Sequence, residues 1–352
     1  MHEGEPHILF EKRGALGLVT LNRPKALNAL THGMCLGMSK FLTEWAGDDQ
    51  IKAVAIRGAG PRAFCAGGDI RAMAESNRDK THVAADFLRD EYRLNALIGA
   101  YAKPYVALTH GVVMGGGAGV SVHGSHRLST EDLAFAMPES GIGFVPDIGA
   151  SFFLSRCPGE TGLYLALTGG RIGLGDAMAF GLMTHHVPAE HHDEIVARLT
   201  EGEAVDAAIT SYARPRPPAS LADQRARIDT MFAASSVEGV LERLDRDGGE
   251  FAAETARTIR GRSPTSLKLA FELLRRGKSL SRNECLKMEY RAAARMVMGH
   301  DFQEGVRAQL LDKDGKPRWQ PASLAGVKDA DIAGYFVDLG AKELQLPENA
   351  RG

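Results

Sequence analysis

The sequence predicts an α/β fold followed by a helical C-terminal region, and three observations carry this prediction. Short apolar strands alternate with helices and glycine-rich loops over roughly the first 150 residues. Helical patterns dominate after that point, and a stretch rich in proline and polar residues, 211–220, has the composition of a linker. Alternating strands and helices favour an α/β architecture. We therefore expect a core over residues 1–210, a helical region over 211–345 and a tail over 346–352.

The N-terminal elements are indicated by apolar alternation and by turn residues. Residues 7–21 predict a β-hairpin with its turn at Gly14, and Asn-Arg-Pro at 22–24 ends the second strand. An amphipathic helix is expected at about 31–47, and a short apolar strand at 52–57 follows it.

The next elements repeat this order without a fixed period, so a regular solenoid is not supported. A glycine-rich loop, FCAGGDI (64–70), precedes a helix expected at 82–101. A strand at 105–109, a second glycine-rich segment, HGVVMGGGAG (110–119), and a further strand near 126–128 complete the alternation.

Helix starts in the last third are marked by capping residues. A Ser-Pro pair at 263–264 predicts an N-cap with proline in the first turn. Ser281–Glu284 fits a capping box, and Asp301–Glu304 is expected to form a second one. From about residue 344 the chain is polar, and a loose tail is expected there.

Composition narrows the possible functions and locations. The 352 residues carry a net charge of −2, with 44% hydrophobic and 24% charged residues, as in ordinary soluble proteins, so no basic field suggests nucleic-acid binding. No signal peptide and no apolar run long enough to cross a membrane are recognisable. The four cysteines form no C-x-x-C pair, which indicates neither disulfides nor zinc. A cytoplasmic protein is therefore expected. The cysteines are Cys35, Cys65, Cys157 and Cys285.

The two glycine-rich loops are candidates for an oxyanion hole. Acyl transfer at a thioester builds negative charge on the carbonyl oxygen, and two converging backbone N–H groups stabilise it. Glycine allows the backbone to approach a ligand closely, so Gly68 and Gly116 are the expected donors. Taken singly, each loop is more simply a tight turn. A dinucleotide fingerprint is excluded, because Val120 stands where its last glycine is needed.

Glu91 falls on the apolar stripe of the helix expected at 82–101. A carboxylate buried on such a face costs free energy unless it has a partner or a function. From spacing alone, a buried Glu91 and one at the edge of the stripe are equally compatible. The apolar members of the stripe are Val83, Phe87, Leu94, Ile98 and Tyr101.

Two further carboxylates, Glu139 and Asp147, lie in the largely apolar stretch FAMPESGIGFVPDIGA (135–150). Its prolines and glycines indicate a loop that folds back on itself, which can bring both carboxylates to one site. Paired carboxylates in apolar surroundings acquire separated pKa values and can divide acid and base roles. The simpler alternative is two solvated loop acids.

Other reactive side chains give weaker signals. The pairs His185–His186 and His191–His192 lack carboxylates at ligand spacing, so no metal site is expected. Cys65 has no histidine nearby in sequence and is expected to be a packing residue. No G-x-S-x-G elbow is present, which argues against an α/β-hydrolase-type serine enzyme.

Together these segments resemble the crotonase (enoyl-CoA hydratase/isomerase) superfamily. The resemblance implies a crotonase-like ββα spiral, an oxyanion hole at Gly68 and Gly116, and a CoA thioester substrate. The matching segments are LNRPKALNAL (21–30), AFCAGGDI (63–70), KPYVALTHGVVMGGGAG (103–119) and FAMPESGIG (135–143).

Within the superfamily the chain is most similar to the 3-hydroxyisobutyryl-CoA hydrolase branch. This resemblance implies Glu139 and Asp147 as catalytic residues, and Glu91, Gly116, Glu139 and Asp147 as substrate-binding residues. The segments that carry it are FLRDEYRLN (87–95), GVSVHGSHRLSTE (119–131), the MPE and PDIG pair (137–149) and a long C-terminal match over 263–321.

One departure from the hydratase pattern separates the two reactions. Hydratases of the family use two glutamates; one matches Glu139, but the other falls on Gly119. Asp147 stands where hydratases commonly have glycine, and it matches the hydrolases. The resemblance therefore implies hydrolysis of a short 3-hydroxyacyl-CoA in valine catabolism.

The rival functions are an enoyl-CoA hydratase or isomerase and a non-catalytic acyl-CoA binding protein. No cofactor is expected beyond the CoA of the substrate, and no nucleic-acid or membrane partner. The resemblance suggests Arg23 or Lys25 as contacts of the CoA phosphates, and leaves a monomer and a homo-oligomer both open.

Overall fold

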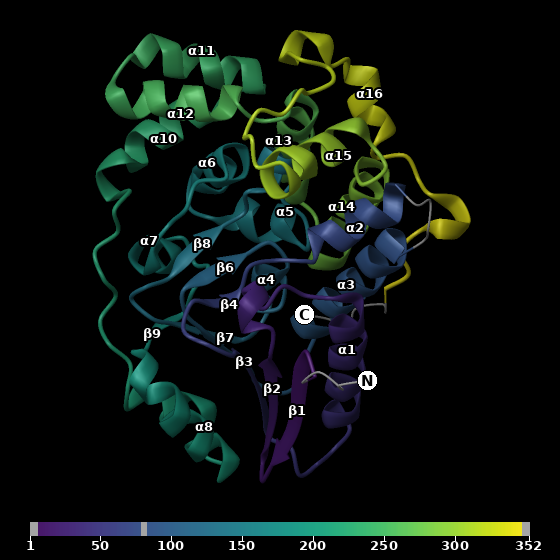
Figure 1. The fold of residues 1–352 in the computed structure, drawn as a ribbon. Helices are drawn as coiled ribbons and strands as arrows, with labels where there is room; N and C mark the ends of the chain where they lie inside the picture. The colour runs from purple at the N-terminus through teal and green to yellow at the C-terminus, as the bar shows by residue number, and fades with distance from the viewer. Residues whose placement is uncertain (1–5, 79–82, 347–352) are drawn as a thin grey trace.

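The computed structural model describes residues 6–78 and 83–346. Two sheets form its centre (Figure 1). The larger has six strands in the order β1-β2-β3-β5-β7-β9, and the smaller has three in the order β4-β6-β8. The larger sheet consists of β1 Ile8–Arg13, β2 Leu16–Leu21, β3 Ala53–Gly58, β5 Tyr105–Thr109, β7 His126–Ser129 and β9 His185–His186; the smaller consists of β4 Ala63–Cys65, β6 Val112–Met114 and β8 Ala134–Ala136.

The chain winds as a spiral because successive turns contribute one strand to each sheet. β1 and β2 form the predicted antiparallel hairpin, and all other pairings are parallel. β3 and β4, β5 and β6, and β7 and β8 are successive strand pairs of this spiral. The predicted α/β fold with a helical C-terminal region is therefore confirmed.

Helices cover the sheets and close the spiral. α1 begins after Thr31, whose side chain accepts a hydrogen bond from the Met34 N–H, and α1 packs against α3. The helices of this part are α1 His32–Ala46, α2 Ile70–Arg78, α3 Val83–Gly99, α4 Gly116–Gly119, α5 Ala150–Phe153, α6 Thr161–Thr168, α7 Leu174–Ala179, α8 His192–Thr200 and α9 Val205–Thr210. The predicted start of α3 at residue 82 lies outside the described residues.

The segment 211–220 contains no helix and runs along one edge of the molecule to the C-terminal helices (Figure 1). Two of those helices begin as predicted: Ser263 caps α13, and Ser281 forms a capping box with Glu284 at the start of α14. The C-terminal helices are α10 Arg225–Phe232, α11 Val237–Asp247, α12 Glu250–Arg260, α13 Pro264–Gly277, α14 Arg282–Met296, α15 His300–Val306 and α16 Asp329–Gly334.

The capping box predicted at Asp301–Glu304 is wrong. α15 begins two residues earlier than this box implies, with Gly299 at its N-cap. The Asp301 carboxylate instead accepts hydrogen bonds from the Ser263 hydroxyl (2.6 Å) and the Gln320 N–H (2.7 Å). The Asp301 side chain therefore forms tertiary hydrogen bonds, although its local spacing predicted a helix cap.

One hydrophobic cluster joins the spiral to the C-terminal helices. α14 packs on α3 and α5, and α13 packs on α5. Leu344 is fully buried, so the loose tail expected from about 344 does not begin there. Residues 347–352 of the expected tail lie outside the described residues. Within the described chain, no helix has the length and apolar character needed to span a membrane.

Candidate active site

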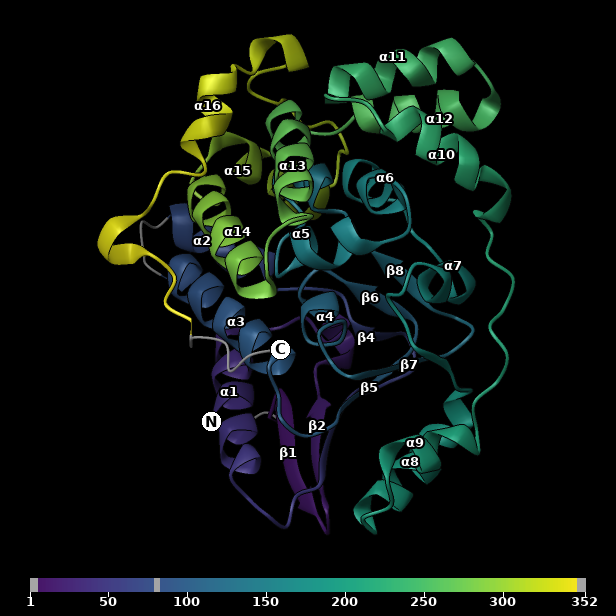
Figure 2. The same cartoon turned by 180° about the vertical axis from the view of Figure 1, so that it is seen from behind.

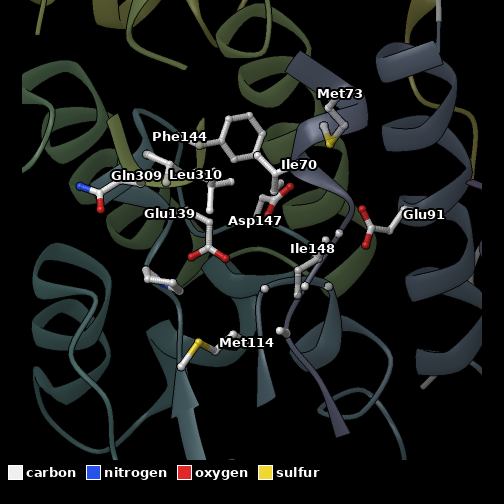
Figure 3. A pocket seen from close by; sticks show the side chains of 18 of the residues that line it. Ile70, Met73, Glu91, Met114, Glu139, Phe144, Asp147, Ile148, Gln309 and Leu310 are labelled. Carbon is white, nitrogen blue, oxygen red and sulfur yellow. The ribbon is translucent and has the colours of Figure 1, made fainter. Parts of the chain in front are cut away.

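All five residues predicted for the site line one cavity of about 380 Å³. Glu91 comes from α3, Gly68 and Gly116 come from the two glycine-rich loops, and Glu139 and Asp147 come from the segment after β8. Figure 3 shows the side chains of Glu91, Glu139 and Asp147 around this space. Segments more than 70 residues apart are thus brought together by the spiral.

The two glycine-rich loops lie side by side because β4 and β6 are paired in parallel. A Cβ added to Gly116 would lie 3.3 Å from the Gly68 nitrogen. The N–H groups of Gly68 and Gly116 have no acceptor among the described residues. Two neighbouring free N–H donors at a cavity wall fit an oxyanion hole.

Gly116 must be glycine for a local reason as well. A Cβ there would lie 2.5 Å from Oε1 of Glu91 and 3.1 Å from the Leu30 side chain. Any larger residue would force the Glu91 carboxylate out of its place. The glycine therefore makes room both for a ligand and for the acid beside it.

Three carboxyl groups are buried in this cavity. Glu91, Glu139 and Asp147 are 4%, 7% and 6% exposed. Oε1 of Glu91 and Oε2 of Glu139 are buried without a hydrogen-bond partner among the described residues. The alternatives of an edge position for Glu91 and of solvated loop acids for the other two are thereby excluded. A buried oxygen without a hydrogen-bond partner costs free energy, so we expect these two oxygens to bind a ligand group or a proton.

Burial shifts the pKa values of these carboxyl groups upwards. Burial and then the charge of Asp147 raise the pKa of Glu91 to about 8. Burial raises the pKa of Asp147 to about 7, although the hydrogen bond from Tyr92 opposes the rise. The pKa of Glu139 lies well above its ordinary value because of burial and then of Asp147. Near neutral pH the site therefore holds protonated and ionised carboxyls together, as acid–base chemistry requires.

The loop that carries Asp147 is strained. Ile148 has φ +55° and Gly149 has φ +92°. A β-branched residue rarely adopts this left-handed conformation, so surrounding contacts must hold it. The loop follows a short 3-10 turn, Glu139–Ile142, that presents Glu139.

Three side chains brace this loop. The Tyr92 hydroxyl donates to Oδ2 of Asp147 (2.7 Å), and the ring of His123 hydrogen-bonds the Ile148 carbonyl oxygen (2.7 Å). The Glu289 carboxylate of α14 accepts hydrogen bonds from the N–H groups of Gly149 and Ser151, both at 2.6 Å. The C-terminal region therefore supports the position of Asp147.

The sequence analysis did not predict that Tyr92, His123 and Glu289 support this loop. Glu289 lies on the buried face of α14, four residues after Cys285 and four before Ala293, both of them buried. This is the same signal that marked Glu91: an acid on an apolar helical stripe. Tyr92 and His123 carry no comparable signal, because their partners are distant in sequence.

Gly119, which matches the second glutamate of hydratases, is crowded by neighbouring side chains. A Cβ added to Gly119 would lie 2.8 Å from Nδ2 of Asn95 and 3.1 Å from the Ile148 side chain. A glutamate there would require the side chains of Asn95 and Ile148 to shift. The site therefore accommodates Asp147, whereas an acid at 119 would need this shift.

The lining of the cavity also includes elements that the sequence did not connect. Ile70 of α2 and Gln309 and Leu310 of a π-helical turn, Arg307–Leu311, line it (Figure 3). The Arg71 guanidinium donates to the Leu310 carbonyl oxygen (2.6 Å) and ties these two elements together.

Other candidate residues lie outside this cavity. Arg23 pairs with Asp69 (3.1 Å) and donates to the Ala29 carbonyl oxygen, whereas Lys25 is exposed; neither lines the cavity. Cys65 is buried. Among the histidine pairs, His186 contacts Glu131 (2.7 Å) and His191 stacks on Tyr212.

Comparisons with known proteins agree with this architecture. The family model described as enoyl-CoA hydratase/isomerase matches residues 16–336. The chain is 45% identical to 3-hydroxyisobutyryl-CoA hydrolase, mitochondrial, of Danio rerio, over 96% of this chain and 91% of that protein. It is 42% identical to the Homo sapiens protein of the same name, over 96% and 90% of the two chains.

Solved structures show the same fold under other names. A carnitinyl-CoA dehydratase from Mycobacterium thermoresistibile is 42% identical, with a TM-score of 0.92 over 97% of this chain and 99% of that one. An enoyl-CoA hydratase from Rhodobacter sphaeroides is 37% identical, with a TM-score of 0.91 over 97% and 100%. By its sequence match, its ββα spiral and these relatives, the chain belongs to the enoyl-CoA hydratase/isomerase, or crotonase, family.

Proposed function

We propose that this protein hydrolyses the thioester of a short 3-hydroxyacyl-CoA, with 3-hydroxyisobutyryl-CoA as the preferred substrate. The observation that carries the proposal is the exchange of carboxylates: Asp147 is buried in the cavity beside Glu139, while the space at Gly119 is filled by Asn95 and Ile148. The names of the curated relatives agree with this choice.

In the proposed reaction the thioester carbonyl oxygen lies between the N–H groups of Gly68 and Gly116. Glu139 first passes its proton to Asp147, and it then attacks the carbonyl carbon or takes a proton from a water that attacks it. Negative charge builds on the oxygen and is stabilised by the two donors. The C–S bond then breaks, and Asp147 gives a proton to the departing CoA thiolate. The net reaction consumes one water and releases a 3-hydroxy acid and CoA.

Glu91 is proposed to hold the 3-hydroxyl of the substrate. Its Oε1 is buried and without a partner, and it lies beside Gly116 at the cavity wall. A substrate hydroxyl would satisfy this oxygen, whereas an acyl group without the hydroxyl would leave it unpaired. This contact would make the site selective for 3-hydroxyacyl groups.

Hydration or dehydration of an enoyl-CoA is the second candidate, because two solved relatives carry such names. A free-thiol assay with 3-hydroxyisobutyryl-CoA, run beside an absorbance assay with crotonyl-CoA, separates the two. We expect thiol release from the first substrate and slow or no hydration of the second. Rapid hydration without thiol release would overturn the proposal. Acyl-CoA binding without turnover of either substrate would instead support the non-catalytic alternative.

The route of attack is tested with heavy-oxygen water in a single turnover. Direct attack by Glu139 forms a mixed anhydride, and its hydrolysis can leave label in the Glu139 carboxylate. Mass spectrometry of the peptide containing Glu139 detects this label. Label in Glu139 supports the anhydride, and its absence counts against the anhydride.

The wider setting of the enzyme follows from the proposed substrate. Valine catabolism is the proposed pathway, and no cofactor beyond substrate CoA is proposed. A cytoplasmic location stays a prediction, and the curated relatives named above are called mitochondrial. Cell fractionation tests the location, and sedimentation tests whether the chain forms a homo-oligomer.

A further inference from the structure

A second cavity, of about 450 Å³, lies at the other end of the strained loop. It is enclosed by the C-terminal end of α3, the segment after α4, α5 and the start of α14, which lie near one another in Figure 2. It shares no lining residue with the cavity that contains Glu91, Glu139 and Asp147, here called the acyl-CoA cavity. The two spaces are therefore separate sites.

The charge of this second cavity is entirely positive. Lys103, Arg127, Arg156 and Arg282 line it, and no aspartate or glutamate does so in the described part of the chain. None of the four cations forms an ion pair with a described carboxylate. In an ordinary structural cluster, acids would balance charges that lie this close.

The four cations are held by main-chain carbonyl oxygens instead of carboxylates. Lys103 donates to the carbonyls of Trp45 and Asp48. Arg127 donates to Leu182, Gly124 and Gly181. Arg156 donates to Phe152, Gly277 and Leu280 and also to the Ser155 hydroxyl. These contacts fix the positions of the cations without neutralising them.

Arg282 has donors to spare. Only one of its five N–H groups, on Nη1, meets an acceptor among the described residues, the Gly99 carbonyl oxygen at the end of α3. Its Nε is buried without a partner in that part of the chain. Helix ends account for the positions of three of the cations: Arg282 meets the C-terminal end of α3, Lys103 that of α1 and Arg156 that of α13, and these negative ends offset part of their charge.

The guanidinium groups of Arg156 and Arg282 both lie against the Phe152 ring, at 3.8 Å and 5.2 Å from its centroid. Burial and then repulsion from Arg156 lower the pKa of Arg282. Guanidinium forks match phosphate oxygens geometrically, and a multivalent anion would relieve the repulsion between these groups. The two guanidinium groups on the Phe152 ring are therefore a candidate contact for a phosphate group.

The second cavity is connected to the active site through one side chain. His123 lines it, and the His123 ring hydrogen-bonds the carbonyl oxygen of Ile148, the residue after Asp147. Phe152 and Phe153, also in its lining, continue the same chain segment into α5. A ligand that shifts His123 or α5 would therefore act on the loop that carries Asp147.

We propose that this basic cavity binds a small phosphate-bearing anion, and that occupancy changes the position of Asp147 through His123 and Ile148. The binding site is independent of the proposed function, whereas the effect on turnover rests on it. The source of the phosphate is either a free inorganic anion or a nucleotide, and the two share the same recognition chemistry.

Calorimetric titration of the full chain tests binding directly. The arms are inorganic phosphate, pyrophosphate and ADP, at constant ionic strength set by chloride. We expect saturable binding of at least one arm. Tighter binding of the inorganic anions identifies a free anion, and tighter binding of ADP identifies a nucleotide. Absence of saturable binding in every arm would overturn the proposal.

Gly181 offers a matched pair of variants. It lines the cavity, its φ is +78°, and a Cβ there meets nothing within 4 Å. Asp and Asn both tolerate this conformation, so Gly181→Asp and Gly181→Asn differ mainly in charge. We expect the aspartate to weaken phosphate binding at least about tenfold and the asparagine to leave it near the parent value. Equal binding in the two variants would contradict the site.

The coupling to turnover is measured separately. Thiol release by the parent and by Gly181→Asn should change at saturating phosphate, and that by Gly181→Asp should not. Binding without any change in turnover would overturn the coupling and leave the site intact. Sedimentation tests whether an acidic segment of a second copy fills the cavity instead. If the chain binds no phosphate and forms an assembly that only Gly181→Asp abolishes, a contact between copies would replace the proposal.

Discussion

The two cavities of this protein are lined by ionisable groups of opposite charge. The acyl-CoA cavity contains three carboxyl groups, and burial raises their pKa values towards or beyond neutrality. The second cavity contains three guanidinium groups and an ammonium group, which are held by carbonyl oxygens. A carboxyl group can lose its charge by taking a proton, whereas a guanidinium group stays charged in proteins. The first cavity is thus suited to moving protons and the second to holding an anion.

The largest expected effect follows from removing a proton-carrying group. Asp147→Asn and Glu139→Gln should each lower the rate of thiol release by roughly 10²–10⁴-fold, because acid–base groups contribute about that much. Asp193→Asn, at an exposed position on α8, is the matched control. A parent-like rate in Asp147→Asn would show that Asp147 does not take part in the reaction in the acyl-CoA cavity.

A smaller effect is expected from Glu91, whose proposed role is binding. Glu91→Gln should raise KM for 3-hydroxyisobutyryl-CoA about tenfold, since one weakened buried polar contact costs about 1–2 kcal/mol. The matched substrate is isobutyryl-CoA, which lacks the 3-hydroxyl group and should show little change in KM. If both substrates lose affinity equally, Glu91 does not contact the hydroxyl.

The smallest effect is a change in the pH dependence of stability. Burial raises the pKa of Glu289 from 4.5 to about 8. The folded chain therefore keeps a proton that the unfolded chain releases, and this favours folding at low pH. Stability should fall as the pH rises from about 4.5 to 8, with Glu91 and Asp147 contributing in the same direction.

Glu289→Gln removes one of these titrating groups while keeping the side-chain volume. The decline in urea-unfolding free energy between pH 5 and pH 8 should become shallower, by at most about 1.4 kcal/mol per pH unit. Glu44→Gln, on the exposed face of α1, should leave the slope of the parent unchanged. A Glu289→Gln slope equal to that of the parent would mean that Glu289 does not titrate in this range.

Local signals in the sequence were sufficient for much of the fold, and they marked five candidate residues that the family resemblance then assigned to one site. The hairpin at β1 and β2 and helix α1 follow from residues that are close in sequence. The apolar stripe marked Glu91 as a candidate but left a buried and an edge position equally open, and the folded chain buries it. Glu139 and Asp147 stood out because acids are costly in an apolar loop.

Long-range contacts account for what could not be predicted. The short strand β6 lies within a segment that looks only glycine-rich, and it forms because β4 and β8 lie on either side of it. Tyr92 and His123 support the Asp147 loop through partners 55 and 25 residues away. The Asp301 side chain was predicted to cap a helix, but in the folded chain it accepts hydrogen bonds from Ser263 and Gln320.

The contact between Gly119 and Ile148 also limits how one reaction of this family could evolve into the other. A glutamate at 119 and the strained loop that presents Asp147 compete for the same space. A change from hydrolase to hydratase would therefore have to adjust the Ile148 contact as well as add the acid at 119.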